Sequence, residues 1–190
     1  MALWESIARS ISDNTGETFT PREQRSVGGG CINSAYRIAD GERSYFVKLN
    51  SADGLTMFEA EADGLRELVA ARAIKVPEPI ATGLAGGQAY IVMENLDLGG
   101  SGSGARLGVE LAALHRTTQA RFGWFRDNTI GSTPQYNSES ADWVSLWREL
   151  RLGAQLKMAA ARGAGGALQR KGERLMADLP AFFTTYTPVP

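Results

Sequence analysis

Cysteine, histidine and long apolar runs are what this 190-residue sequence has least of. Its one cysteine excludes an internal disulfide and fits a reducing cytoplasm, which is the expected location. No apolar stretch approaches the roughly 20 residues of a membrane span, and the N-terminus lacks the basic segment and apolar run of a signal peptide. Lysine and arginine form no cluster and the net charge is −1, so neither nucleic acid nor a membrane surface is expected as a partner.

The stretch from residue 26 to residue 50 carries the first chemical signal. The backbone of Gly28, Gly29 and Gly30 can approach a ligand closely because these residues have no Cβ. No helix start follows, as a Rossmann turn requires, and no Gly-Lys-Ser/Thr, as a Walker A loop requires. Two strands are predicted instead, at 32–38 and 44–49, joined by an Asp-Gly turn. The second of these strands carries Lys48. A glycine loop followed by a hairpin whose returning strand carries a lysine is typical of the phosphate-binding half of a kinase-like site. The alternative is a flexible glycine loop with a lysine that extends to solvent.

A helix is predicted from Thr56 to about Ala73. Its apolar residues recur at helical spacing, and Glu61 lies on the same stripe, between Phe58 and Leu65. Glu59 falls on the polar side, beside Ala62, Asp63 and Arg66. Because a carboxylate on an apolar face needs a cation or a donor, we expect Glu61 to pair with Lys48. The alternative is that Glu61 lies at the edge of the stripe and reaches water.

The remaining pattern predicts an α+β chain in two parts. A first helix is expected from Leu3 to Ile11, a first strand at 19–27, a fourth strand after the Val-Pro-Glu-Pro at 76–79, and a fifth at 89–94. A glycine-serine segment at 99–104 reads as a hinge, and beyond it we expect only helices. The predicted domains are therefore a nucleotide-binding lobe at 1–95, a hinge at 96–104 and a helical lobe at 105–190. Backbone groups at the end of the fifth strand are expected to contact adenine, at Met93, Glu94, Asn95 and Leu96.

Several motifs together resemble the fructosamine kinase (ketosamine-3-kinase) family. They are Gly-Gly-Gly-Cys-Ile-Asn at 28–33, Phe-Val-Lys at 46–48, Met-Phe-Glu-Ala-Glu at 57–61, Val-Met-Glu at 92–94, and Asp-Asn-Thr-Ile-Gly-Ser-Thr-Pro-Gln at 127–135. The resemblance implies a protein-kinase-like bilobal fold with a five-stranded antiparallel N-terminal lobe, and it places Asn33 in the nucleotide site. It also implies phosphorylation of the sugar 3-hydroxyl of ketosamines by ATP and Mg²⁺, on free lysine or glycated lysine side chains of proteins. The 3-phosphate would then promote loss of the sugar, which is deglycation.

The sequence departs from the family pattern at the catalytic loop. The family carries His-Gly-Asp there, whereas the one histidine of this chain, His115, is followed by Arg-Thr. His115 is predicted instead to be a core residue of its helix. The base and the metal-binding aspartate are therefore expected to be absent from these residues, so the chain is interpreted as a fragment that is inactive alone.

Two further residues or segments have open roles. Backbone N–H groups around Cys31 would favour its thiolate, and the resemblance implies that such a loop cysteine can join two subunits of a homodimer; the alternative is a small residue that fills a tight loop. The segment 127–140 would frame the sugar site or only cap the helical lobe. Two other functions stay open: an aminoglycoside-type phosphotransferase, which would need a strongly acidic pocket, and a nucleotide-binding module without catalysis.

Overall fold

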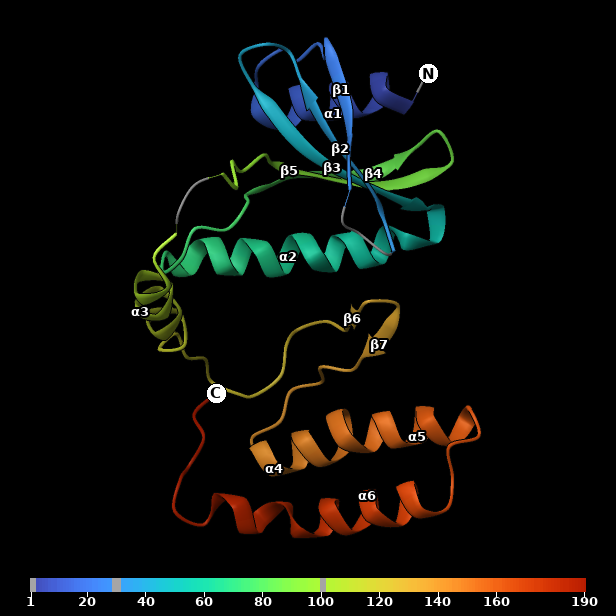
Figure 1. Ribbon diagram of the computed structural model, residues 1–190, viewed down its shortest axis with the longest axis vertical. Coiled ribbons are helices and arrows are strands. Elements are labelled where there is room, and N and C mark those ends of the chain that lie inside the picture. Colours follow the sequence, from blue (N-terminus) through green and yellow to red (C-terminus); the bar gives the residue numbers. More distant parts are fainter. Residues whose placement is uncertain (1–2, 29–31, 100–101) are drawn as a thin grey trace. The chain divides into compact units, whose positions relative to one another are not determined.

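The computed structural model describes residues 3–28, 32–99 and 102–190 (Figure 1). The chain divides into two compact units, Met1–Thr117 and Thr118–Pro190. The division by compactness falls after the helix that follows the glycine-serine segment, so the lobe and hinge bounds expected from the sequence stay a prediction. In the described part of the chain, no helix has both the length and the apolarity needed to cross a membrane.

The first unit is built on an antiparallel sheet of five strands. In sheet order they are β1 (Glu23–Val27), β2 (Ser34–Ala39), β3 (Ser44–Ser51), β5 (Gln88–Glu94) and β4 (Pro79–Ala85). The strand predicted to begin at residue 19 begins at Glu23, because Phe19 turns into the core and packs edge-on against Tyr45. The five strands and their order along the chain match the prediction.

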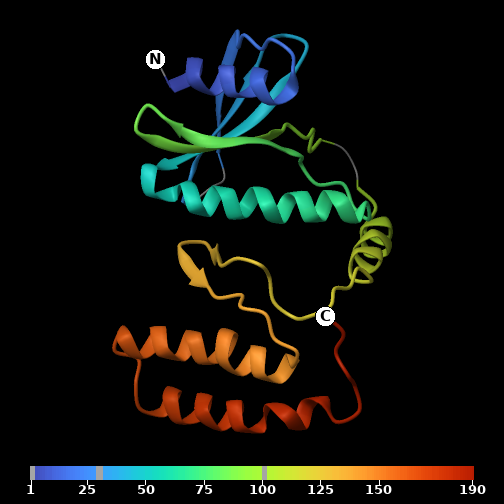
Figure 2. The same cartoon turned by 180° about the vertical axis from the view of Figure 1, so that it is seen from behind.

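Two helices cover opposite faces of this sheet, as both views show (Figures 1 and 2). Helix α1 (Leu3–Thr15) buries Ile7 and Ile11 against one face. Helix α2 (Leu55–Ala71), which follows a 3-10 turn at Ala52–Gly54, packs Phe58 and Ala62 on the other face. Helix α3 (Gly104–Leu114) completes the unit. Because successive strand residues alternate between the faces, β3 and β5 divide their side chains between an α1 layer and an α2 layer.

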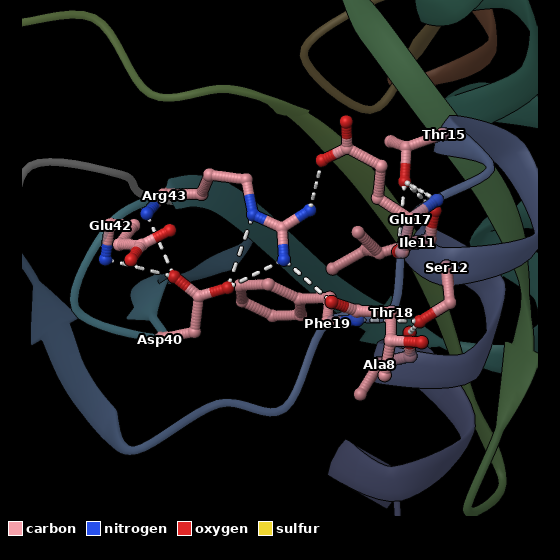
Figure 3. A network of polar contacts seen from close by, with 10 residues as sticks. All are labelled: Ala8, Ile11, Ser12, Thr15, Glu17, Thr18, Phe19, Asp40, Glu42 and Arg43. Carbon is pink, nitrogen blue, oxygen red and sulfur yellow. Dashed lines mark hydrogen bonds and ion pairs between the residues drawn. The ribbon is translucent and has the colours of Figure 1, made fainter.

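A polar network fixes the β2–β3 hairpin to the segment between α1 and β1 (Figure 3). The Asp40 carboxylate accepts hydrogen bonds from the backbone N–H groups of Glu42 and Arg43, at 3.0 and 2.7 Å. The Arg43 guanidinium binds Asp40, donates to the Glu17 carboxylate at 2.8 Å, and donates to the Thr18 carbonyl at 2.6 Å. The backbone N–H of Arg43, followed by its side chain, holds the pKa of Asp40 below its usual value. The predicted Asp-Gly turn is thus confirmed, and the Arg43 guanidinium connects it to Glu17 and Thr18.

The second unit contains a small hairpin as well as helices. Strands β6 (Asn128–Ile130) and β7 (Thr133–Gln135) are joined by a two-residue loop that begins with Gly131 at φ +62°. A glycine with positive φ at that position is a standard hairpin connection. The prediction that the chain is entirely helical after the hinge is therefore wrong, because the positive φ of Gly131 allows a tight turn between two short strands.

The helices of the second unit follow this hairpin. Helix α4 (Trp143–Leu146), a π-helical turn (Trp147–Gly153) and α5 (Ala154–Ala161) form one continuous run, which is followed by α6 (Ala167–Asp178) and a 3-10 turn (Leu179–Phe183). Helices α5 and α6 approach closely at Gly172, where a Cβ would lie 2.4 Å from a methyl carbon of Leu156.

Candidate functional site

Lys48 lies on the α2 face of the sheet because of its position in β3. Its neighbours Val47 and Leu49 are buried in the α1 layer, so alternation along the strand turns Lys48 the other way. The Lys48 ammonium contacts the Glu61 carboxylate of α2 at 2.5 Å. The two side chains are 27% and 30% exposed, so the pair is partly open to solvent. The predicted pairing of Lys48 with Glu61 is confirmed.

The face of α2 that packs on the sheet is centred differently from the face predicted by the apolar stripe. Ala62, which the helical pattern placed on the polar side, is buried with 1% exposure. Helix α2 packs on the sheet through Phe58, Ala62 and Leu65, and the small Ala62 side chain fits beside Ile91. Glu61 therefore lies at the edge of the packed face, where its carboxylate can reach Lys48.

The glycine loop is described only at its ends. Gly28 is exposed, whereas Gly29, Gly30 and Cys31 fall outside the described residues. After the loop, Asn33 accepts a hydrogen bond from the Asn50 amide at 2.7 Å, which ties the start of β2 to the end of β3. Asn50 was missed in the sequence analysis. The hairpin register, with Ser34 opposite Leu49, places position 33 opposite position 50 and could have revealed it.

The predicted adenine-contacting segment leaves the sheet at the end of β5. The Met93 side chain is buried against α2, with 4% exposure. The Glu94 carboxylate binds Lys75 of the α2–β4 connection, and the Asn95 amide donates to the Ser44 hydroxyl at 3.2 Å. Leu96 is half-buried. The side chains of Met93, Glu94 and Asn95 thus have partners within the protein, and Lys75 was not predicted.

His115 is the one histidine of the sequence, and it directly follows α3. His115 was expected in the core, but it is exposed, and none of the residues of α3, all of which are described, is buried. The apolar stripe of the helix predicted a buried position for His115, but α3 packs no face tightly within its unit.

Among residues 3–28, 32–99 and 102–190, no group of three or more His, Cys, Asp or Glu side chains could hold a metal ion.

The second unit contains a buried polar cluster around Asn137. Its side chain is 3% exposed and donates to the Arg126 carbonyl and to Asn128, at 3.1 and 2.9 Å. Its amide oxygen accepts from Arg151, which lies in the π-helical turn, and its backbone N–H donates to Asp127 at 2.7 Å. Burial lowers the pKa of Arg151, and the negative charge of Asp127 opposes that shift. Through Arg151, this cluster connects the β6–β7 hairpin, which lies in the segment 127–140, to the helical run that contains the π-helical turn.

Comparison with known protein sequences identifies a family. The fructosamine kinase family model matches residues 3–190. A protein named probable ketoamine kinase from Synechocystis sp. is 48% identical over 164 residues, which are 85% of this chain and 56% of that protein. A chloroplastic protein-ribulosamine 3-kinase from Arabidopsis thaliana is 46% identical over 162 residues, which are 83% of this chain and 50% of that protein. The chain thus spans about half the length of these curated relatives.

Solved structures show the same fold. A candidate fructosamine-3-kinase from Thermobifida fusca has a TM-score of 0.77 at 29% identity, covering 97% of this chain and 64% of that chain. Another from Haemophilus somnus has a TM-score of 0.87 at 24% identity, covering 100% of this chain and 64% of that chain. A mutant aminoglycoside phosphotransferase bound to AMP-PNP and hygromycin B shares the fold alone, with a TM-score of 0.50 at 13% identity over 92% of this chain and 60% of that chain. The predicted α+β, protein-kinase-like fold class is confirmed.

Proposed function

Because this chain belongs to the fructosamine kinase family, we propose that it supplies the nucleotide-binding part of an enzyme that phosphorylates ketosamines. The observation that carries the proposal is the ion pair between Lys48 of β3 and Glu61 of α2. In kinases of this fold, a strand lysine held by a helix glutamate contacts the nucleotide phosphates. The phosphoryl donor in this proposal is ATP.

ATP is proposed to bind between the glycine loop and the end of β5. Backbone N–H groups of residues 28–30 would face its phosphates, with Lys48 beside them. Asn33 would act through its bond to Asn50, which fixes the strand that leaves the loop. Backbone groups of residues 93–96 would contact the adenine edge, since the side chains of Met93, Glu94 and Asn95 already have partners.

The acceptor is proposed to be the 3-hydroxyl of a ketosamine on free lysine or on a glycated protein. In the transfer, the bond between the γ-phosphorus and its bridging oxygen breaks, a bond from that phosphorus to the sugar 3-oxygen forms, and ADP and the hydroxyl proton are released. The 3-phosphate is a better leaving group than the hydroxyl and so promotes loss of the sugar from the amine. The name of the Arabidopsis relative supports the 3-position.

Transfer of the phosphoryl group also needs Mg²⁺ on the nucleotide and a group that accepts the hydroxyl proton. The family implies Mg²⁺ with the nucleotide; the described residues contain no group of three or more His, Cys, Asp or Glu side chains that could hold a metal ion, and the sequence has no His-Gly-Asp. We therefore propose that the groups for metal binding and proton transfer lie outside this sequence and that the 190 residues alone bind nucleotide without turnover. The cytoplasmic location and the Cys31-linked homodimer stay predictions, and no finding supports the homodimer.

The experiment compares acceptor classes on two proteins. One is the 190-residue chain, and the other is a chimera that continues after Pro190 with the corresponding C-terminal residues of the Synechocystis relative. ATP consumption is measured with ribuloselysine, fructoselysine and an aminoglycoside. We expect ketosamine-dependent turnover by the chimera alone. Turnover with the aminoglycoside only would favour the other phosphotransferase class, and turnover by the 190 residues alone would show that the catalytic groups lie within them.

A further inference from the structure

Lys75 and Glu94 form an ion pair where the α2–β4 connection meets the end of β5. The Lys75 ammonium lies 2.7 Å from Oε1 and 2.5 Å from Oε2 of Glu94, so it contacts both carboxylate oxygens. The side chains are 66% and 36% exposed. A pair this exposed adds little to the stability of the fold, but it does link the α2–β4 connection to the end of β5.

The same carboxylate is bound to the backbone of the connection. Glu94 donates its backbone N–H to the Glu78 carbonyl at 2.8 Å, and the Glu78 N–H donates to Glu94 Oε2 at 3.4 Å. The next residue, Pro79, has no N–H to give to β5, and the β4–β5 register shifts between Pro79 and Ala81. Contacts of Glu94 with residues 75–78 therefore hold β5 at a point where the strand ladder is weak.

The other side of the strand end is also fastened. Asn95, immediately after β5, donates from its side chain to the hydroxyl of Ser44 at the start of β3. Consecutive residues are thus bound to segments on both sides, Glu94 to the approach of β4 and Asn95 to β3. This arrangement fixes the backbone as it leaves the sheet.

We infer that Lys75 is a positioning residue for adenine recognition, acting through Glu94 on the backbone of residues 94–96. The inference rests on the proposed function, in which that backbone contacts the adenine edge. Backbone groups held in their binding geometry need no ordering when the ligand arrives, and this raises affinity. Without Lys75 the strand end loses its contact with the α2–β4 connection at residue 75 and is held less firmly, so binding of the base must order it further.

The test separates binding of the base from binding of the phosphates. Calorimetric titrations with ATP and with tripolyphosphate, both in Mg²⁺, are run on the wild-type chain and on Lys75→Met, Lys75→Arg and Glu94→Gln. The control is Arg66→Met, which removes a cation from an exposed pair with Asp63 on α2. We expect Lys75→Met and Glu94→Gln to bind ATP roughly three- to tenfold more weakly. Tripolyphosphate binding should not change, and Lys75→Arg and Arg66→Met should resemble wild type.

Each contrary result has a distinct meaning. Wild-type affinity for ATP in Lys75→Met overturns the role of Lys75 and leaves the nucleotide site standing. Equal weakening of tripolyphosphate also overturns it, because the lysine would then act through charge or overall folding. Failure of the wild-type chain to bind either ligand overturns the proposed nucleotide site itself, and this role of Lys75 with it.

Discussion

Glu61 positions the Lys48 ammonium without being deeply buried. Both side chains keep more than a quarter of their surface exposed, so solvent screens their attraction and the pair should add at most about 1 kcal/mol to stability. In the proposed site, a phosphate contact made by the same lysine would be a charge-assisted hydrogen bond, which is roughly twice as strong as a neutral one. The pair is therefore better suited to ligand binding than to holding α2 on the sheet.

We expect Glu61→Gln to weaken nucleotide binding more than it weakens folding. We expect the affinity for ATP to fall roughly three- to tenfold, because an amide holds the ammonium less firmly, while the unfolding free energy changes by less than about 1 kcal/mol. Calorimetric titration and urea unfolding measure the two quantities. Glu23→Gln is the control, since it removes the same charge from the exposed pair with Arg37 on β1 and β2. Large destabilisation with unchanged ATP affinity would make Glu61 a structural residue.

At the scale of elements, the charged Asp40 carboxylate contributes to the stability of the β2–β3 hairpin. Its pKa is lowered in the folded chain, first by the Arg43 backbone N–H and then by the Arg43 side chain. A carboxyl group with a lowered pKa contributes stability that is fully present above its unfolded pKa, about 3.9. That contribution is lost as the pH falls through the lower folded value.

Asp40→Asn should therefore destabilise the chain in a pH-dependent way. The difference in unfolding free energy between wild type and variant should be largest above about pH 5 and should shrink as the pH falls below about 4. Urea unfolding across that range measures it. Glu42→Gln removes a charge from the same turn but leaves the contacts of Arg43 with Asp40 and Glu17 in place, so it should not reproduce the profile. A difference that is constant with pH would contradict the account.

Sequence patterns predicted the elements whose signals are local. The alternation around Lys48 and the Asp-Gly turn at 40–41 fix the hairpin, and the expected strands and α2 follow. The patterns failed where distant segments decide the outcome. Whether Ala62 is buried depends on β5, the exposure of His115 depends on how α3 is covered, and Lys75 meets Glu94 only after β4 and β5 have formed.

At the scale of the whole molecule, the two units contribute differently to the proposal. The first brings together the lysine, the glutamate and the strand end that form the proposed nucleotide site. The second carries the Asn137 cluster, in which Asn137 contacts Asp127 and Asn128 of the segment 127–135. The chain spans about half the length of the curated relatives it matches, and in our proposal the remaining part supplies further groups for the transfer.

The most direct measurement follows labelled phosphate onto the sugar. The chimera with the Synechocystis C-terminal residues, as wild type, Lys48→Met and Arg66→Met, is incubated with ribuloselysine and ATP labelled on the γ-phosphate. The sugar oxygen that carries the phosphate in the product is identified by NMR. The account predicts label on the 3-oxygen with wild type and Arg66→Met, and a rate lower by at least about tenfold with Lys48→Met, because a phosphate contact made by a charged group is worth about 1.5–3 kcal/mol. Equal rates with wild type and Lys48→Met, or label on no ketosamine at all, would contradict it.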